Sequence, residues 1–363
     1  MNAMLLEDCC EILDNLRVPI TASERKSGPY PYYGANGIQD YVDEYIFDDE
    51  LVLLAEDGGN FGSKTRPIAY RVSGKCWVNN HAHVLKPKPG LDVDFLCYSL
   101  MFYKTDGLVN GATRQKLTQA TMRKMLIPNM TLENQRIVVD KLNRVLSIKS
   151  EREKQLVKLD ELIKARFIEM FGSVKTELLL EDISEFITVG IANSATHAYS
   201  DSGVPLLRNQ NIKENFLDDT DLKYITPEFA KLYESKKLKE NDIIAMRTGY
   251  PGVCCLVPKK YEGCQTFTTL IIRLKPNNNP VYICNFINSD FAKAFIDSEK
   301  VGVAQQNLGA KSLAKMPIII APKEKQDIFS EFAKQVDKSK VAIQKSLAET
   351  QLLFDKLMQD YFG

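Results

Sequence analysis

The sequence contains no long apolar run and no excess of either charge. Its 363 residues include 47 basic and 47 acidic side chains, which argues against a uniformly basic nucleic-acid binder but leaves the distribution of charge open. No apolar stretch approaches the roughly 18 residues that a membrane-spanning helix needs, so we expect no membrane partner. The first 17 residues carry acids before their first base, unlike a secretory signal peptide, and we therefore expect a cytoplasmic protein.

Paired metal-binding cysteines are also missing. The eight cysteines include no pair separated by two residues, so the sequence indicates neither a zinc ribbon nor a thioredoxin-like site. Reduced thiols are the simplest interpretation. His81 and His83 could lie on one side of a strand, but the third histidine, His197, belongs to the other half of the chain. We therefore expect no metal site.

The motifs of common enzyme classes are absent as well. Residues 62–65 (Gly-Ser-Lys-Thr) imitate a phosphate-binding loop, but the lysine does not directly follow the glycine and the upstream glycine is missing. The sequence has no G-x-S-x-G, H-E-x-x-H or G-x-G-x-x-G pattern, and no Asn-Pro-Pro-aromatic tetrapeptide of the kind that DNA amino-methyltransferases use. These absences favour a protein that reads a partner, with no catalytic residue and no cofactor of its own.

What the sequence does contain is an internal repeat. Residues 5–8 and 179–182 are both Leu-Leu-Glu-Asp. Further matches recur at a constant offset of 191 residues, from Gly111 with Gly302 to Phe171 with Phe362. The chain therefore consists of two similar halves, about 1–172 and 173–363.

Each half has a globular front followed by a helical back. The fronts are rich in turn signals formed by Gly, Asn and Pro, and short β-type runs lie between these turns. The clearest β-type runs are residues 50–54, 68–72, 253–257 and 270–274, and helical patterns cover 95–103 and 281–297. We therefore predict the α+β class, with two similar α+β domains at 1–130 and 173–321.

The backs, residues 131–172 and 322–363, are predicted to form two long helices. Their interiors contain no Gly or Pro, and apolar residues recur at alternating spacings of four and three. Lys149 and Lys340 interrupt this heptad seam at equivalent positions, where a polar residue commonly sets the register. Because neither helix is stable alone, we predict that the two pack on each other as an antiparallel coiled coil between the domains.

Basic stretches recur in both fronts. In the first front, residues 58–91 carry six bases and no acid, and residues 107–130 carry four bases and no acid. In the second front, the equivalent residues 300–323 carry four bases and no acid. Amides and aromatics lie between these bases, and Arg can read guanine while Asn or Gln can read adenine. The candidate DNA-binding residues are Asn60, Lys64, Arg66, Asn80, His81, Arg114 and Lys116 in the first front, and Arg208, Asn209, Gln210, Arg247, Tyr250, Gln306 and Lys311 in the second.

The whole chain resembles the specificity subunit of type I restriction–modification enzymes. In the first front, the similarity lies in residues 30–37 (Tyr-Pro-Tyr-Tyr-Gly-Ala-Asn-Gly), 55–59 (Ala-Glu-Asp-Gly-Gly), 66–69 and 77–85. In the second front, it lies in residues 204–208, 242–247 and 305–308. Family members often carry Trp-Ile at the positions of Leu206 and Leu207, and this chain departs from that pattern.

The resemblance implies that each front is a target recognition domain for one half of a split sequence in double-stranded DNA. The helix pair would fix the gap between the halves and dock two methyltransferase (M) subunits, which bind S-adenosylmethionine and methylate adenine N6. Restriction/translocase (R) subunits would join with ATP and magnesium. This chain would itself be non-catalytic and would bind no cofactor.

The sequence is also compatible with two other classes of function. A coiled-coil scaffold whose fronts bind proteins would also fit the repeat, and the zero net charge is its best support. An enzyme acting on DNA or RNA is disfavoured because the catalytic motifs are missing. The salt dependence of binding would distinguish a protein scaffold from a DNA-binding protein, since contacts with phosphates weaken steeply as salt rises.

Overall fold

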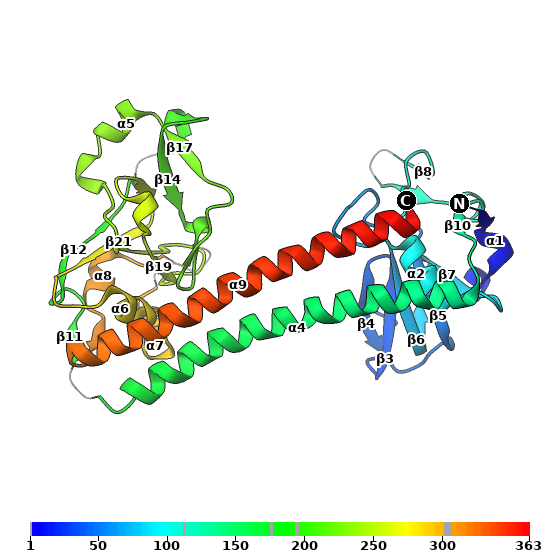
Figure 1. The fold of residues 1–363 in the computed structure, drawn as a ribbon, viewed down its shortest axis with the longest axis horizontal. Helices are drawn as coiled ribbons and strands as arrows, with labels where there is room; N and C mark the ends of the chain where they lie inside the picture. Colours follow the sequence, from blue (N-terminus) through cyan, green and yellow to red (C-terminus); the bar gives the residue numbers. More distant parts are fainter. Residues whose placement is uncertain (1, 112–113, 175–176, 193–195, 301–306) are drawn as a thin grey trace. The chain divides into compact units, whose positions relative to one another are not determined.

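The computed structural model describes residues 2–111, 114–174, 177–192, 196–300 and 307–363 (Figure 1). The chain forms two compact units, Met1–Glu153 with Gln344–Gly363, and Lys154–Ile343. The helices α4 (Leu132–Phe171) and α9 (Lys323–Phe362) each begin in one unit and end in the other. The sequence-based expectation of two long helices is therefore confirmed.

The first domain is built mainly of antiparallel strands. Its strands are β1 (Ala3–Leu5), β2 (Cys10–Ile12), β3 (Tyr30–Gly34), β4 (Gly37–Val42), β5 (Phe47–Ala55), β6 (Ala69–Val78), β7 (Ala82–Pro87), β8 (Val109–Asn110), β9 (Lys116–Leu117) and β10 (Leu126–Pro128). Its short helices are α1 (Leu6–Cys9), α2 (Val93–Met101) and α3 (Gln119–Met122). Six strands form one sheet in the order β2-β7-β5-β6-β3-β4, in which only β3 and β6 pair in parallel.

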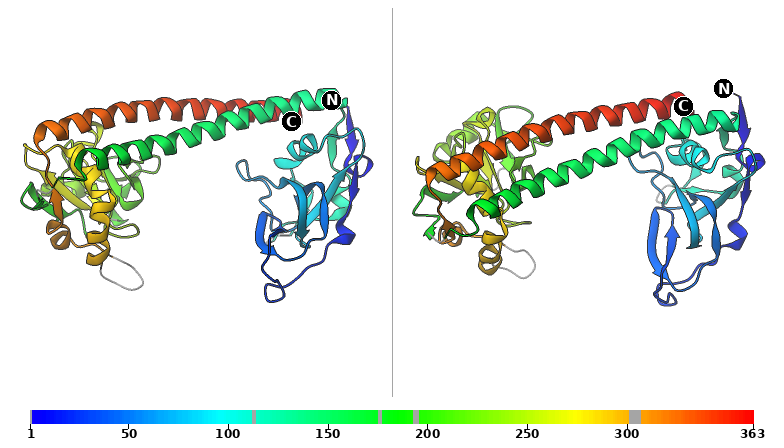
Figure 2. Two further views of the ribbon diagram at one scale, coloured as in Figure 1. Left: turned by 90° about the horizontal axis from the view of Figure 1, so that it is seen from below. Right: turned by 60° about the horizontal axis from the view of Figure 1, so that its bottom comes forward.

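Helix α2 connects this sheet to the long helix α4. Asp92 caps α2, because its carboxylate accepts hydrogen bonds from the N–H groups of Asp94 and Phe95. One face of α2 packs on the sheet (Figure 2). The Tyr98 hydroxyl donates to Asn143 Oδ1 of α4 at 2.6 Å. The long helix is thus anchored in the core of the first domain.

The second domain has two four-stranded sheets, in the orders β12-β21-β18-β19 and β13-β17-β14-β20. Its strands are β11 (Glu177–Leu179), β12 (Ser184–Val189), β13 (Tyr199–Ser200), β14 (Val204–Arg208), β15 (Ile212–Lys213), β16 (Phe216–Leu217), β17 (Lys223–Ile225), β18 (Ile243–Ala245), β19 (Cys254–Leu256), β20 (Gln265–Phe267), β21 (Leu270–Leu274) and β22 (Pro317–Ile319). Its helices are α5 (Pro227–Lys231), α6 (Pro280–Ile287), α7 (Asp290–Glu299) and α8 (Ala310–Ala314). The predicted α+β class is confirmed for both domains.

The helices α4 and α9 pair through equivalent contacts. In the first unit Lys149 Nζ donates to Gln351 Oε1 at 2.7 Å, and in the second unit Lys340 Nζ lies 2.6 Å from Asp160 Oδ1. The repeat offset of 191 relates Lys149 to Lys340 and Asp160 to Gln351, so each contact repeats the other. In each unit the beginning of one helix lies beside the end of the other, which makes the pair antiparallel, as predicted.

The expected helix at 281–297 is wrong in one respect, because the structure divides it into α6 and α7. The amide of Asn288 bonds to both main-chain groups of Cys254, accepting from the N–H at 3.0 Å and donating to the carbonyl at 2.9 Å. Ser289 Oγ then donates to the Phe286 carbonyl at 2.6 Å. These bonds end α6 at β19, and the sequence pattern could not predict them because Cys254 is distant in the chain.

Within the part of the chain that the structure describes, no helix is both long and apolar enough to cross a membrane.

Candidate nucleic-acid interface

Three segments of the first domain converge at the end of strand β5. The N–H of Glu56 donates to the carbonyl of His81 at 2.9 Å, and the N–H of Leu117 donates to the carbonyl of Glu56 at 2.7 Å. We call residues 56–58, 80–83 and 114–117 the first loop cluster. It contains four of the predicted DNA-binding residues, Asn80, His81, Arg114 and Lys116.

The exposed side of this cluster is organised around the carboxylate of Asp57. His81 Nδ1 lies 2.6 Å from Asp57 Oδ1, and Arg114 Nη2 donates to the same oxygen at 2.8 Å. Only 17% of the Asp57 side chain is exposed, whereas 60% of the Arg114 side chain is exposed. The aspartate is therefore the recessed partner, and the guanidinium is the group that faces solvent.

Glu56, the neighbouring acid, holds two further cations. Its Oε2 accepts from Arg17 Nη1 at 2.7 Å, and its Oε1 lies 3.0 Å from Lys116 Nζ. Burial raises the pKa of the Glu56 carboxyl, but hydrogen bonds from Arg17 and Lys116 outweigh this effect and leave the pKa below its usual value. Glu56 thus stays ionised, and half of the Lys116 side chain remains exposed beside Asp57.

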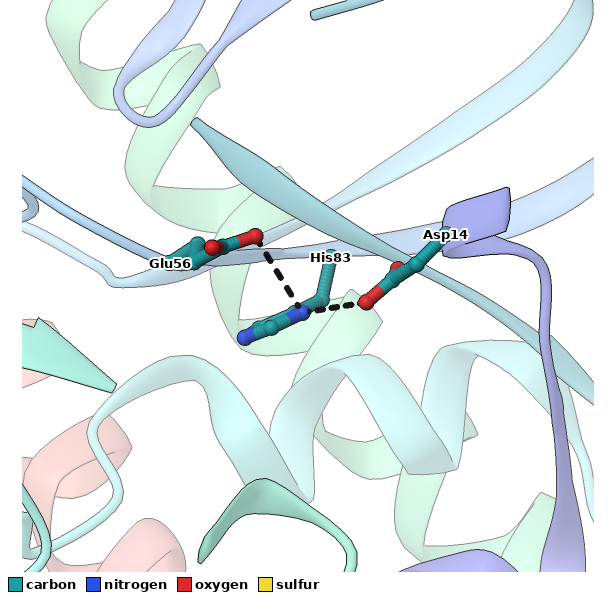
Figure 3. Close-up of side chains that lie close together, drawn as sticks. All are labelled: Asp14, Glu56 and His83. Atoms are coloured by element: carbon teal, nitrogen blue, oxygen red, sulfur yellow. Dashed lines mark hydrogen bonds and ion pairs between the residues drawn. The ribbon is translucent and has the colours of Figure 1, made fainter. Parts of the chain in front are cut away.

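A buried ion-pair network lies next to these exposed groups. Figure 3 shows the imidazole of His83 between the carboxylates of Asp14 and Glu56. His83 Nδ1 lies 2.6 Å from Asp14 Oδ2, and His83 Nε2 lies 2.9 Å from the carbonyl of Leu117. The network therefore ties the N-terminal segment to β7 and to the strand that follows Arg114.

The Asp14, Glu56 and His83 side chains are also the residues that could hold a metal ion, since their ligand atoms lie within 4.8 Å of one another. Arg17 already occupies the space between the two acids, 2.7 Å from Glu56 and 3.5 Å from Asp14. Both His83 nitrogens already face oxygen partners. A cation would have to displace these bonds, so we interpret the three residues as a supporting network.

The remaining first-domain candidates lie outside the shared Asp57 contacts. The carbonyl of Asn60 accepts from Ser63 N–H at 3.0 Å, and Ser63 Oγ accepts from Arg66 N–H at 2.9 Å, which closes a tight turn. The side chains of Arg66 and Asn80 are exposed. Lys64 borders a hollow of about 980 Å³ formed with the end of α2 and the end of α9.

In the second domain, Asp221 is the centre of a comparable group. Arg208 Nη2 donates to the Asp221 carbonyl at 2.8 Å and to its Oδ2 at 3.0 Å, and Gln210 Nε2 donates to Oδ2 at 2.7 Å. The hydrogen bond from Arg208 and the charge of Lys223 hold the pKa of Asp221 below its usual value. Here 16% of the Arg208 side chain and 60% of the Asp221 side chain are exposed, so the carboxylate is the outward-facing group.

Two more predicted residues join the same surface. Asn209 Nδ2 donates to Thr248 Oγ1 at 2.8 Å, and Arg247 Nε donates to Asn307 Oδ1 at 2.8 Å. The main chain at Leu308 also donates to the Arg247 carbonyl at 2.9 Å. We call residues 208–211, 221, 247–248 and 307 the second loop cluster.

Three second-domain candidates are not part of these contacts. Tyr250 is 76% exposed. Lys311 lies on α8, where it borders a groove of about 450 Å³ with residues at the start of β12. Gln306 lies outside the residues that the structure describes.

The sequence analysis missed the residues that arrange the candidates, above all Asp57 and Asp221. Both are acids, whereas the charge pattern pointed to bases, amides and aromatics. A usable sequence signal for Asp57 is the Asp-Gly pair that it forms with Gly58, which is typical of a turn. In the structure Gly58 has a φ of +62° after the end of β5. No local signal marks Asp221, because its partner Arg208 lies 13 residues earlier.

The thiols offer little chemistry. All eight cysteines are buried and none forms a disulfide. Burial raises the pKa of Cys76, Cys97 and Cys264 to about 12, so these thiols stay protonated at neutral pH and are poor nucleophiles.

Comparison with known proteins finds one family model that matches the chain in two regions. A model of the type I restriction modification DNA specificity domain matches residues 1–159 and 176–351. The chain is 39% identical over 146 residues to a type I restriction enzyme specificity subunit of Haemophilus influenzae, an alignment that covers 40% of this chain and 37% of that protein. It is 20% identical over 304 residues to the EcoKI specificity subunit of Escherichia coli, covering 76% of this chain and 65% of that protein. The matched region thus spans less than two thirds of the length of either relative.

A solved structure shares the fold. The S subunit of a type I restriction–modification system from M. genitalium superposes with a TM-score of 0.59, covering 100% of this chain and 96% of that chain at 12% sequence identity. At this identity the likeness concerns the fold alone: two α+β domains joined by long helices.

Proposed function

The chain belongs to the type I restriction modification DNA specificity family, and on this basis we propose that it is the DNA-recognition subunit of a type I restriction–modification complex. Each domain reads one half of a bipartite target in double-stranded DNA. The observation that carries this proposal is the double match of the family model, with a loop cluster of cations and amides inside each match. Two similar domains in one chain suit a target of two half-sites. In the same way, symmetric protein dimers bind palindromic DNA sites.

The distribution of charge supports DNA as the partner despite the zero net charge. The acids of the first loop cluster are recessed, with 13% of Glu56 and 17% of Asp57 exposed, while Lys116 and Arg114 are at least half exposed. Lysine and arginine side chains presented in this way neutralise phosphates or reach base edges.

The helix pair is proposed to set the distance between the half-sites and to dock two methyltransferase (M) subunits. Ile137 and Ile328 are equivalent in the repeat and are 46% and 58% exposed. Leu162 and Leu353 are also equivalent and are 47% and 49% exposed. Apolar side chains left exposed at the same positions of both repeats suit two copies of one partner.

The chemistry would then belong to the partner subunits. We propose that S-adenosylmethionine binds to the M subunits, which methylate adenine N6, and that ATP with magnesium binds to restriction/translocase (R) subunits. This chain is proposed to be non-catalytic and cytoplasmic. Flipping the target adenine out of the duplex is a cost that the whole complex meets.

DNA affinity should depend steeply on salt. For six to ten phosphate contacts, affinity for a duplex is expected to fall by about 10³–10⁵ between 50 and 200 mM salt. Lys116→Ala should reduce the slope of log affinity against log salt by about 1, since one phosphate contact is lost. Fluorescence anisotropy with a labelled duplex, using the chain together with its M subunits, measures both effects.

Lys86→Ala is the matched control, because Lys86 pairs with Asp49 away from the loop cluster and should leave the slope unchanged. If the affinity for DNA does not change with salt, and protein partners also bind independently of salt, the chain would instead be a coiled-coil scaffold.

A further inference from the structure

Arg114 is held at its tip as well as at its backbone. The segment that carries it is fixed by the hydrogen bonds from Gly58 N–H to the Gln115 carbonyl (3.2 Å) and from Leu117 N–H to the Glu56 carbonyl (2.7 Å). Its guanidinium is fixed by the 2.8 Å bond from Nη2 to Asp57. A long side chain restrained at both ends loses little further freedom when it binds a partner.

The backbone at Gly58 makes this placement possible. Gly58 has a φ of +62°, and a Cβ at this position would lie 3.4 Å from Arg114 Nε. The guanidinium therefore lies against the main chain of Gly58, where no side chain intervenes. Its Nε edge faces the turn and its Nη2 atom faces Asp57.

Part of the Arg114 guanidinium is left unbonded by the described chain, because neither Nε nor Nη1 has a hydrogen-bond partner there. No hydrogen bond joins Arg114 Nη1 to any residue that the structure describes, and the side chain is 60% exposed. Guanine is the base that offers two acceptors, N7 and O6, in the major groove, and Arg is the side chain that most often pairs with it. A phosphate also accepts hydrogen bonds from a guanidinium, and the variants below distinguish a phosphate contact from a base contact.

Burial shows which partner in the pair is the support. An acid placed only to weaken binding to DNA would stand in the open. Asp57 is instead recessed, and it also contacts His81 Nδ1 at 2.6 Å, so it braces two of the candidate residues at once. The neighbouring acid, Glu56, is committed to Arg17 and Lys116 and cannot replace it.

We propose that Asp57 is a positioning residue that holds Arg114 in the orientation for reading one guanine in the first half of the DNA target. This inference rests on the proposed function and goes beyond it, because it assigns a base to a named side chain and a role to an acid. Asp57 itself does not touch DNA.

The test is selection from a randomised duplex library by the full chain purified with its M subunits. Asp57→Asn keeps the size of the side chain but removes its charge. We expect preference for guanine at one position of the first half-site to fall by about tenfold, within the 5- to 150-fold range that corresponds to one base contact. Preferences at the other positions of the first half-site and in the second half-site should be unchanged, which gives an internal control for the folding of both domains.

Three further variants sharpen the test. Arg114→Lys keeps the charge but loses the planar fork, so it should lose the preference at the same position. Asp57→Glu retains the carboxylate and should retain most of the preference. Asp49→Asn is the matched control, since Asp49 pairs with Lys86 near the start of β5, whereas Asp57 follows the end of this strand.

The outcomes are distinguishable. If the wild-type chain selects no bipartite motif, the proposed function fails and this inference falls with it. If the wild-type chain selects a motif and Asp57→Asn selects it with the same base ratios, the inference alone is wrong. A uniform loss of affinity for all sequences in Arg114→Lys would also overturn it, because the contact would then be with phosphate.

Discussion

Phe171→Ala should lower the free energy of unfolding of the second unit by about 3–5 kcal/mol, the usual cost of removing a buried aromatic ring. Phe171 ends α4 and is fully buried. Its ring centroid lies 4.6 Å from Tyr282, 5.0 Å from Phe167 and 5.7 Å from Phe329. The cavity left by alanine would thus open among three aromatic rings that join both long helices to α6.

The measurement can separate the two domains because the chain has a single tryptophan, Trp77, in the first. Chemical denaturation followed by circular dichroism should show that the second unit unfolds at a lower denaturant concentration. The transition followed by Trp77 fluorescence, which reports on the first domain, should change little. Phe216→Ala is the control, since Phe216 is 56% exposed and its removal should cost less than about 0.5 kcal/mol. A loss below 1 kcal/mol for Phe171→Ala would contradict the packing described here.

The same variant has a functional consequence. If α4 sets the distance between half-sites, loosening its end should allow the chain to accept target spacers of more than one length. Selection from duplexes with spacers of varied length would show this as a broader distribution. The accepted spacer lengths would vary more widely while the half-site sequences stay the same. This outcome distinguishes Phe171→Ala from Asp57→Asn.

Asp14→Ala should destabilise the first domain by a similar amount, about 3–5 kcal/mol, because it removes one partner of a buried ion pair. Only 4% of the Asp14 side chain is exposed, and its Oδ1 also accepts from Val84 N–H at 2.8 Å. The substitution would leave His83 and Arg17 without their shared carboxylate. Denaturation followed by Trp77 fluorescence measures the loss, and Asp40→Ala, in a surface ion pair with Arg25, should cost about 0–1 kcal/mol.

The pH dependence of folding stability should reflect the ionisation of Asp14. Burial raises the pKa of Asp14, but the hydrogen bond and charge of His83, the Val84 N–H and the charge of Arg17 together lower it below its usual value. A lowered folded pKa means that ionisation stabilises the fold above the unfolded value of about 3.9, and that this stability is lost as pH falls through the lower folded pKa. Wild-type stability should therefore decline below about pH 5, and Asp14→Ala should show a flatter decline. Parallel acid titrations of the two proteins would contradict this account.

The architecture could be predicted from the sequence because its signals are local or repeated. The seam of α4 and α9 follows a fixed period, so the burial of Leu142 and Phe329 and the matching positions of Lys149 and Lys340 could be inferred without a structure. The division of α6 from α7 could not, since it depends on bonds from Asn288 to a distant strand.

The loop clusters were predictable only in part. Charge patterns identified Arg114, His81 and Lys116, which the structure brings together, but they could not reveal that Asp57 joins two of them across 24 and 57 residues of chain. Nor could they reveal that Arg208 is mostly buried while Asp221 is exposed. Such pairings depend on loop geometry, and the sequence carries no periodic signal for them.

We propose that this chain determines which DNA sequence its complex modifies. The most direct test co-expresses the chain with its M subunits and maps modified adenines in the host genome by single-molecule sequencing. We predict methylation at one split motif, lost when this chain is deleted and altered in only one half when residues 173–321 are exchanged for the corresponding domain of a relative. Methylation that persists unchanged after deletion of the chain would contradict the account.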